Sequence, residues 1–174
     1  MTQLVLTAVG DDREGLVSAL AGTVETHGGN WLDSQLSRLA GKFAGIVLVE
    51  LPAEGVAEFT SACARLRQEI GWNVEVSPVG SGGVEGSEVR MHLVGLDRPG
   101  MVRQVTAALA EQHVSIRELR SWTPDAPQGG GSLFEADAVI TLANDVHLDV
   151  VRRALEPIAD ELMVDLDLSD PDGQ

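Results

Sequence analysis

Hydrophobic and polar residues alternate at the start of the chain, and the same alternation returns 85 residues later. The apolar positions are Leu4, Leu6 and Ala8 in the first stretch and Val89, Met91 and Leu93 in the second. A period of two residues is typical of a strand with one buried face. Each stretch is therefore predicted to be a strand, the first of them covering residues 1–9.

After each predicted strand the apolar period changes to three and four residues. The repeated positions are Leu16, Val17, Leu20 and Val24, followed 85 residues later by Met101, Val102, Val105 and Leu109. This spacing places side chains on one face of a helix. Two different periods that share one offset indicate an internal duplication.

Each half continues with the same order of elements. Further strands are predicted at residues 30–39, 43–51 and 72–79 in the first half and at 115–123, 134–142 and 162–168 in the second. Second helices are predicted from the apolar faces formed by Val56, Phe59, Cys63, Leu66 and Ile70, and by Val150, Val151, Ala154, Leu155 and Ile158. The order βαββαβ predicts an α+β fold of two tandem ferredoxin-like units, each an antiparallel sheet with both helices on one face.

The boundaries follow from composition. Residues 1–79 and 88–168 are the two predicted domains, residues 80–87 are a linker rich in Gly and Ser, and the polar tail 169–174 is expected to be disordered. The second half contains six extra residues within 123–132, which predict a flexible hairpin extension, with a ligand lid as the alternative. Residues 43–51 are almost continuously apolar, which favours a sheet buried on both faces. The face without helices would be covered by sheets that pack face to face or edge to edge, within the chain or in a dimer.

Charge and composition narrow the classes of partner. The formal net charge is −15 and Lys42 is the only lysine, so direct binding to DNA or RNA is not expected. No apolar stretch approaches the length of a membrane span, and residues 1–9 lack the features of a secretory signal. The single cysteine, Cys63, excludes an internal disulfide framework. These observations predict a cytoplasmic protein without a cofactor.

Both halves place an Asp-Arg-x-Gly turn between the first strand and the first helix. The turns are Asp11-Asp12-Arg13-Glu14-Gly15-Leu16 and Asp97-Arg98-Pro99-Gly100-Met101. Glycine allows a ligand to approach the backbone, and the free N–H groups of a first helical turn suit a carboxylate. The aspartates could face an ammonium group. The alternative is structural, because Asp is a common N-cap, Pro fits the first helical position and Gly suits a tight turn.

Asn30, which begins the second strand of the first half, is a further candidate for ligand binding. Its amide group can donate and accept hydrogen bonds at once, as an amino acid requires. Ser115 occupies the corresponding place in the second half. The first copy is therefore expected to be the stronger site.

Catalytic and metal-binding patterns are not evident. The histidines His27, His92, His113 and His147 are isolated from one another and from Cys63, without the spacing of metal ligands. No pair of carboxyl groups is identifiable as an acid and a base. The sequence therefore predicts a protein that is not an enzyme.

A ferredoxin-like unit with Asp97-Arg98-Pro99-Gly100 in its first turn resembles the ACT domain, a regulatory module that binds amino acids. Asp12-Arg13-Glu14-Gly15 and Asn30-Trp31-Leu32 resemble the same family. Among tandem ACT proteins without a catalytic domain, residues 29–39 and 43–46 are most similar to the glycine cleavage system repressor type. The resemblance implies an accessory regulator, expected to be a homo-oligomer, that binds a small amino acid such as glycine and a partner such as a transcription factor. The alternative is an oligomerisation or interaction module of the same fold without a ligand.

The resemblance and the turn chemistry together predict one set of ligand-binding residues. These are Asp11, Asp12, Arg13, Gly15, Leu16, Asn30, Trp31, Asp97, Pro99, Gly100, Met101 and Ser115.

Overall fold

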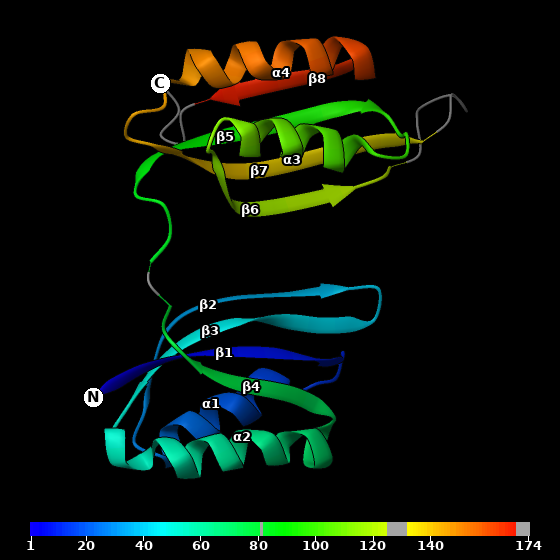
Figure 1. The fold of residues 1–174 in the computed structure, drawn as a ribbon. Helices are drawn as coiled ribbons and strands as arrows, with labels where there is room; N and C mark the ends of the chain where they lie inside the picture. The colour runs from blue at the N-terminus through cyan, green and yellow to red at the C-terminus, as the bar shows by residue number, and fades with distance from the viewer. Residues whose placement is uncertain (81, 125–131, 170–174) are drawn as a thin grey trace. The chain divides into compact units, whose positions relative to one another are not determined.

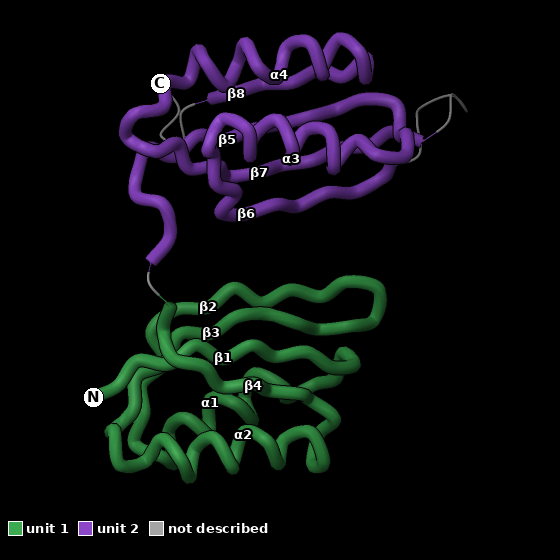
Figure 2. Tube along the Cα trace, in the orientation of Figure 1, with its two compact units in different colours: residues 1–81 green, residues 82–174 purple. Residues whose placement is uncertain are grey.

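The computed structural model describes residues 1–80, 82–124 and 132–169. The chain divides into two compact units, residues 1–81 and 82–174 (Figure 2). Each unit is described by itself, with the element labels of Figure 1.

The first unit contains two helices, four strands and one short 3₁₀ helix. In chain order they are β1 (Thr2–Asp11), α1 (Leu16–Thr26), β2 (Asn30–Leu39), β3 (Lys42–Leu51), η1 (Ala53–Gly55), α2 (Val56–Ile70) and β4 (Trp72–Pro78). The second unit repeats the order as β5 (Gly86–Leu96), α3 (Met101–Glu111), β6 (Ser115–Trp122), β7 (Leu133–Ala143), α4 (Leu148–Leu162) and β8 (Val164–Ser169). The predicted βαββαβ order is confirmed in both halves.

Each unit has one four-stranded antiparallel sheet, with order β2-β3-β1-β4 in the first and β6-β7-β5-β8 in the second. The two helices of each unit cover one face of its sheet (Figure 1). The edge strands β2 and β6 both have an irregular register near their start, between Trp31 and Asp33 and between Ile116 and Glu118. The duplication therefore extends to a local distortion of the backbone.

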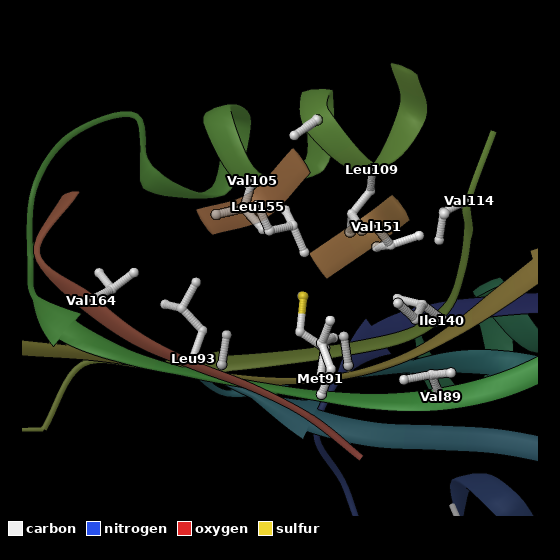
Figure 3. Close-up of a cluster of buried hydrophobic side chains, with 14 of the residues drawn as sticks. Val89, Met91, Leu93, Val105, Leu109, Val114, Ile140, Val151, Leu155 and Val164 are labelled. Atoms are coloured by element: carbon white, nitrogen blue, oxygen red, sulfur yellow. The ribbon is translucent and has the colours of Figure 1, made fainter. Parts of the chain in front are cut away.

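Alternation along the strands builds the core. Inward-facing residues such as Leu6, Val47 and Val49 are fully buried against α1 and α2 in the first unit. In the second unit Met91 lies on the sheet and Val105 on α3, within a cluster of buried side chains between helices and sheet (Figure 3). Burial of apolar side chains on this single face of each sheet is the main source of stability of each unit.

Several details differ from the sequence predictions. β5 begins at Gly86, so Gly86 and Ser87 belong to a strand and not to the predicted linker 80–87. A Cβ at Gly86 would lie 1.7 Å from the Leu142 carbonyl oxygen, so only glycine fits at this position. The predicted tail begins one residue early, because Ser169 pairs with Arg90 in β8. The predicted loop insertion 125–131 and the tail 170–174 lie outside the described residues.

The predicted face of the last helix needs correction at one position. Val150 is 38% exposed and does not join Val151 and Leu155 in the core. On β3, the outward-facing Ile46 is 51% exposed. The continuous apolar run of β3 thus supplies one face buried within the unit, and the cover of its other face by a second sheet stays a prediction.

Candidate functional site

The two Asp-Arg-x-Gly turns share an unusual backbone conformation. Gly15 and Gly100 are the N-cap residues of α1 and α3, with φ of 85° and 95° in the left-handed region. That region favours glycine over residues with a Cβ. A Cβ built on either glycine would meet no atom within 4 Å. Glycine is therefore required here by backbone conformation, and the space in front of it is open.

The N-cap residues of both helices supply no side-chain cap. Gly15 and Gly100 have no side chain, so neither makes a capping hydrogen bond of that kind. The first N–H groups of a helix have no partner within the helix and attract anions. The Leu16 and Met101 side chains, both predicted to contact a ligand, are instead buried in the core at 3% and 2% exposure. Leu16 can offer a ligand only its backbone, whereas Met101 also lines a hollow beside Gly100.

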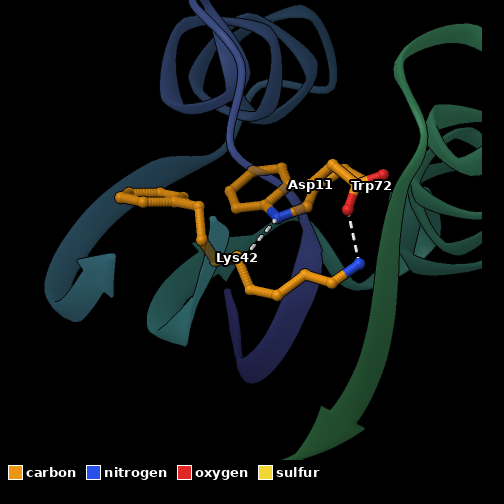
Figure 4. Close-up of polar contacts among 4 residues, drawn as sticks. Asp11, Lys42 and Trp72 are labelled. Carbon is orange, nitrogen blue, oxygen red and sulfur yellow. Dashed lines mark hydrogen bonds and ion pairs between the residues drawn. The ribbon is translucent and has the colours of Figure 1, made fainter. Parts of the chain in front are cut away.

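The aspartates of the first turn are paired with the β2–β3 hairpin. The Lys42 ammonium group donates to the Asp11 carboxylate (Figure 4). Arg38 donates to Asp12 at 3.2 Å. The hydrogen bond from Lys42 and its charge lower the pKa of Asp11. Both carboxylates therefore already have cationic partners, which makes them less available to the ammonium group of an amino acid.

The backbone of each turn is hydrogen-bonded to the hairpin that follows it in the same unit. The Asp12 N–H donates to the Gly41 carbonyl, and the Asp97 N–H donates to the Ser132 carbonyl, both at 2.9 Å. Each turn is thereby tied to the neighbouring hairpin. These bonds use the backbone N–H, so they position both turns without depending on the aspartate side chains.

The arginines of the motif lie at the end of the second helix of their unit. Arg98 donates to the Leu162 carbonyl at 2.6 Å, where α4 ends. The guanidinium group of Arg13 lies beside Gly71, the C-cap of α2. A cation at a helix C-terminus satisfies terminal carbonyls and interacts favourably with the helix dipole. The repeated arginine is thus explained by packing within each unit.

Asn30 and Gly15 lie at opposite ends of the first unit. Asn30 pairs with Glu50, whereas Asp11, close to Gly15, pairs with Lys42 at the other end of β3. The separation is about the length of the 11-residue α1, roughly 16 Å. One amino acid cannot reach both residues within a single unit.

The second unit has the same separation. Ser115 pairs with Thr141, and Leu96, which precedes the Gly100 turn, pairs with Leu133 at the far end of β7. Trp31 packs partly against the core of the first unit, and Pro99 is exposed beside its turn. The predicted site residues are therefore gathered only in part: the turn residues lie together, and Asn30, Trp31 and Ser115 lie elsewhere.

A hollow beside the Gly100 turn was not predicted from the sequence. It has a volume of about 540 Å³, and its wall consists of Asp97, Arg98, Gly100, Met101, Val102, Arg103, Thr106 and Phe134. It adjoins a smaller apolar crevice between α3 and β6, where Ile116 and Leu119 face Met101 and Val102. No clear signal for it is present in the sequence, because Val17, which corresponds to Val102 in the first unit, is exposed to nearly the same extent, at 40% against 43%.

Other reactive side chains do not form a centre. Cys63 is fully buried in α2, and burial raises the pKa of its thiol to about 11, so it is a core residue and not a nucleophile. His92 contacts Asp137 at 2.6 Å on an exposed sheet surface. Among the described residues, no group of three or more His, Cys, Asp or Glu side chains is arranged to hold a metal ion. Within the same residues, no helix has the length and apolar character needed to cross a membrane.

Comparison with known proteins gives a family match for the first unit. The model of the ACT domain matches residues 2–77, which is the whole of the first sheet and its helices. A search of curated proteins found no match. Among solved structures, an unknown protein from Galdieria sulphuraria is 29% identical, with a TM-score of 0.86 and 97% of both chains covered.

A second solved structure is that of a candidate glycine cleavage system transcriptional repressor. It is 18% identical, with a TM-score of 0.74 over 97% of this chain and 96% of the other. At this identity the match shows a shared fold and not a shared activity. It extends across both units, so the tandem arrangement is common to the two proteins. Residues 2–77 match the ACT domain family, and the fold of this unit is repeated in the second half of the chain.

Proposed function

We propose that this protein is a regulatory amino-acid sensor that acts through a protein partner, as an accessory transcriptional regulator of the glycine cleavage repressor type. One observation supports it most: both units present an uncapped helix N-terminus behind a left-handed glycine that faces open space. A carboxylate suits such a position. The family and the fold similarity agree with a regulatory role.

The ligand of the first unit bridges two copies of the chain in this proposal. Gly15 and Asn30 are roughly 16 Å apart within one unit, so a site that uses both needs Gly15 from one copy and Asn30 from another. Binding would then favour the assembled state, because the ligand interacts with that state alone. A homo-oligomer controlled by a small amino acid, with glycine as the first candidate, follows from this arrangement.

The test begins with calorimetric titration of the full chain with the common amino acids. The Gly15→Leu variant, which fills the space in front of the turn, is expected to abolish the heat of binding. Gly41→Leu is the matched control, because Gly41 has φ of 77° and equally open surroundings in the β2–β3 hairpin. It carries the same backbone strain without blocking the helix N-terminus. Absence of heat with every amino acid in the unmodified chain would overturn the sensor proposal.

Mixing two inactive variants tests the bridging arrangement. Gly15→Leu and Asn30→Ala should each lose binding, and an equimolar mixture should recover part of it, since one of the two sites in a mixed dimer retains both residues. Asn30 is exposed, so its replacement is not expected to affect folding. If the mixture stays inactive while each variant still assembles, the ligand does not bridge copies.

A second candidate function is a ligand-free oligomerisation module. The observation in its favour is that the charged residues of the turn have partners within the unit: Asp11 with Lys42, Asp12 with Arg38, and Arg98 with the end of α4. In that case Gly15→Leu should change only the free energy of unfolding, and to the same extent as Gly41→Leu.

A further inference from the structure

The helices of the first unit leave one face of its sheet uncovered (Figure 1). The centre of this outward face is apolar, and its apolar residues lie on the two central strands: Val5, Val9, Ala44, Ile46 and Leu48. Val9 and Ile46 are 48% and 51% exposed. Asp33 and Glu75 lie on the edge strands, at the borders of this patch. A contiguous apolar patch with a polar rim is typical of a surface that binds another protein.

The outward residues of β3 run from a cation through three apolar side chains to an anion. In order they are Lys42, Ala44, Ile46, Leu48 and Glu50. If a second β3 lies over the first in the opposite direction, with Ile46 at the centre, the small Ala44 meets the larger Leu48. Lys42 then meets Glu50, which has no ion pair of its own among the described residues. β3 is therefore complementary in charge and in size to an antiparallel copy of itself.

The outward residues of β1 have the same symmetry. They are Gln3, Val5, Thr7, Val9 and Asp11. Thr7 pairs with Ile46, so both strands have their centre in one row of the sheet. Reversal about this row places Val5 over Val9 and Gln3 over Asp11, where the amide group of Gln3 can donate to the carboxylate. A single two-fold axis across the strands therefore suits both.

The second unit lacks this symmetry although its fold is the same. On β7, Glu135, Asp137 and Val139 stand where β3 has its three apolar residues. Reversal about Asp137 would place one carboxylate over another, and Glu135 over Val139. Burial of unpaired carboxylates is unfavourable. The self-complementary pattern is thus a property of the first unit's own residues and not a consequence of the repeated fold.

The size of the outward face sets the strength of the association. Sheets that pack face to face keep their strands within about 30° of one another, which an antiparallel pair of copies allows. β1 and β3 have ten residues each. With strands about 4.8 Å apart and about 3.3 Å per residue, the four-stranded face covers roughly 600 Å². Two copies would bury about 1,200 Å², the lower end of specific interfaces, which suits a reversible dimer.

We infer that two copies of the chain associate through the outward faces of their first sheets, about a two-fold axis through the row of Ile46 and Thr7. Lys42 of each copy meets Glu50 of the other. This inference goes beyond the proposed function, because the dimer forms without an amino acid and does not involve Gly15 or Asn30.

The experiment is sedimentation equilibrium of the full chain without added amino acids, from about 1 μM to about 1 mM, the range in which an interface of this size dissociates. A monomer–dimer equilibrium is expected. Ile46→Asp places two carboxylates at the axis and should weaken the dimer at least about tenfold, while the monomer stays folded. Val17→Asp is the matched control, since Val17 is 40% exposed on α1, away from the outward face.

Lys42→Glu and Glu50→Lys test the antiparallel register. Either variant brings like charges together twice in its own dimer and should associate roughly tenfold more weakly. An equimolar mixture should recover the original affinity, since each contact of the mixed dimer pairs one carboxylate with one ammonium group. Glu69→Lys makes the same change of charge at an exposed position of α2 and should associate as the unmodified chain does.

The outcomes separate this inference from the proposed function. A chain that stays monomeric up to about 1 mM would overturn the inference, and so would a dimer that Ile46→Asp leaves intact. Two weakened charge variants whose mixture recovers no affinity would also overturn it, because the register would be wrong. A dimer that responds as expected, in a chain that gives no heat with any amino acid, would support the inference and refute the sensor proposal.

Discussion

The outward faces of the two sheets differ although their backbones match. A row of four paired residues crosses each sheet at the same place. In the first unit the row is Gln35, Ile46, Thr7 and Glu75, and in the second it is Arg120, Asp137, His92 and Asp167. The centre of the row is uncharged in the first unit, where Ile46 pairs with Thr7, whereas in the second unit His92 contacts the Asp137 carboxylate.

The inward faces of the same strands have changed much less. Leu6 and Met91 occupy corresponding places and are both buried, as are Val47 and Ala138. Substitution in a close-packed interior is limited by volume and polarity, whereas an outward face tolerates almost any residue. The comparison shows that the repeated fold constrains one face of each sheet and leaves the other free to acquire different partners.

The largest loss of stability should come from placing a carboxylate on the buried face of β3. Val47→Asp puts a charge where the side chain is fully buried, which costs several kcal/mol, a large part of the 5–15 kcal/mol that holds a typical domain together. Ile46→Asp, one residue earlier, reproduces the arrangement of Asp137 and should change the free energy of unfolding by less than about 0.5 kcal/mol.

Denaturant unfolding followed by tryptophan fluorescence distinguishes these variants. Trp31 and Trp72 report on the first unit and Trp122 on the second. Val47→Asp should abolish the transition of the first unit only. Equal effects of the two variants would contradict the assignment of faces.

A smaller loss of stability is expected from adding a side chain at Gly45 on β3, where the neighbouring strand β2 comes too close for a Cβ. Gly45→Ala places a Cβ 2.1 Å from the Gln35 carbonyl oxygen, although the corresponding residue of the second unit is Ala136. The overpacking should destabilise the first unit by about 1–3 kcal/mol. The reciprocal Ala136→Gly should cost the second unit about 0.5–1 kcal/mol. Thermal unfolding of both variants checks the asymmetry, which would be refuted by equal shifts.

Replacing the arginine of either turn should lower the free energy of unfolding by a smaller amount. Arg98→Ala removes a charged hydrogen bond to the Leu162 carbonyl and should destabilise the second unit by about 1–2 kcal/mol. Arg13→Ala is expected to cost the first unit less, since its guanidinium group lies beside Gly71 without a hydrogen bond of this kind among the described residues. Hydrogen exchange at the ends of α2 and α4 would show the local loosening. A larger effect of Arg13→Ala would reverse this ranking.

The smallest effect concerns the ion pair of Asp11 and Lys42, for which the second unit has Leu96 opposite Leu133. Because Lys42 lowers the pKa of Asp11 in the folded state, the pair stabilises the first unit above the ordinary pKa of aspartate, near 3.9. That contribution is lost as the pH falls through the lowered value. Lys42→Ala should return the pKa of Asp11 toward its ordinary value in an NMR titration. An unchanged pKa would refute the pairing.

Much of the fold followed from periodicity. The shared offset of 85 residues predicted both units, because alternation and helical spacing are imposed by burial on one face of each element. The bounds of β2 were correct, and β5 was placed two residues too late because Gly86 was assigned to a flexible linker. Composition alone does not distinguish a glycine in a flexible linker from a glycine in a strand where a neighbouring carbonyl group leaves no room for a Cβ.

The candidate site was less predictable. The Asp-Arg-x-Gly turns were identified, and their left-handed glycines are where the motif placed them. The partners of Asp11, Asp12 and Arg98 were not foreseen, since Lys42, Arg38 and the end of α4 come from distant segments. Gly15 and Asn30, both predicted to bind the ligand, are separated within one unit by a helix of 11 residues.

The sequence by itself determined the duplication, the order of elements and the position of each turn, because these depend on neighbours along the chain. Only the tertiary structure decided which charges are paired, that Gly15 and Asn30 lie at opposite ends of a unit, and that a crevice opens beside Gly100. These features depend on side-chain volume and direction across strands and helices far apart in the chain, which no local pattern encodes.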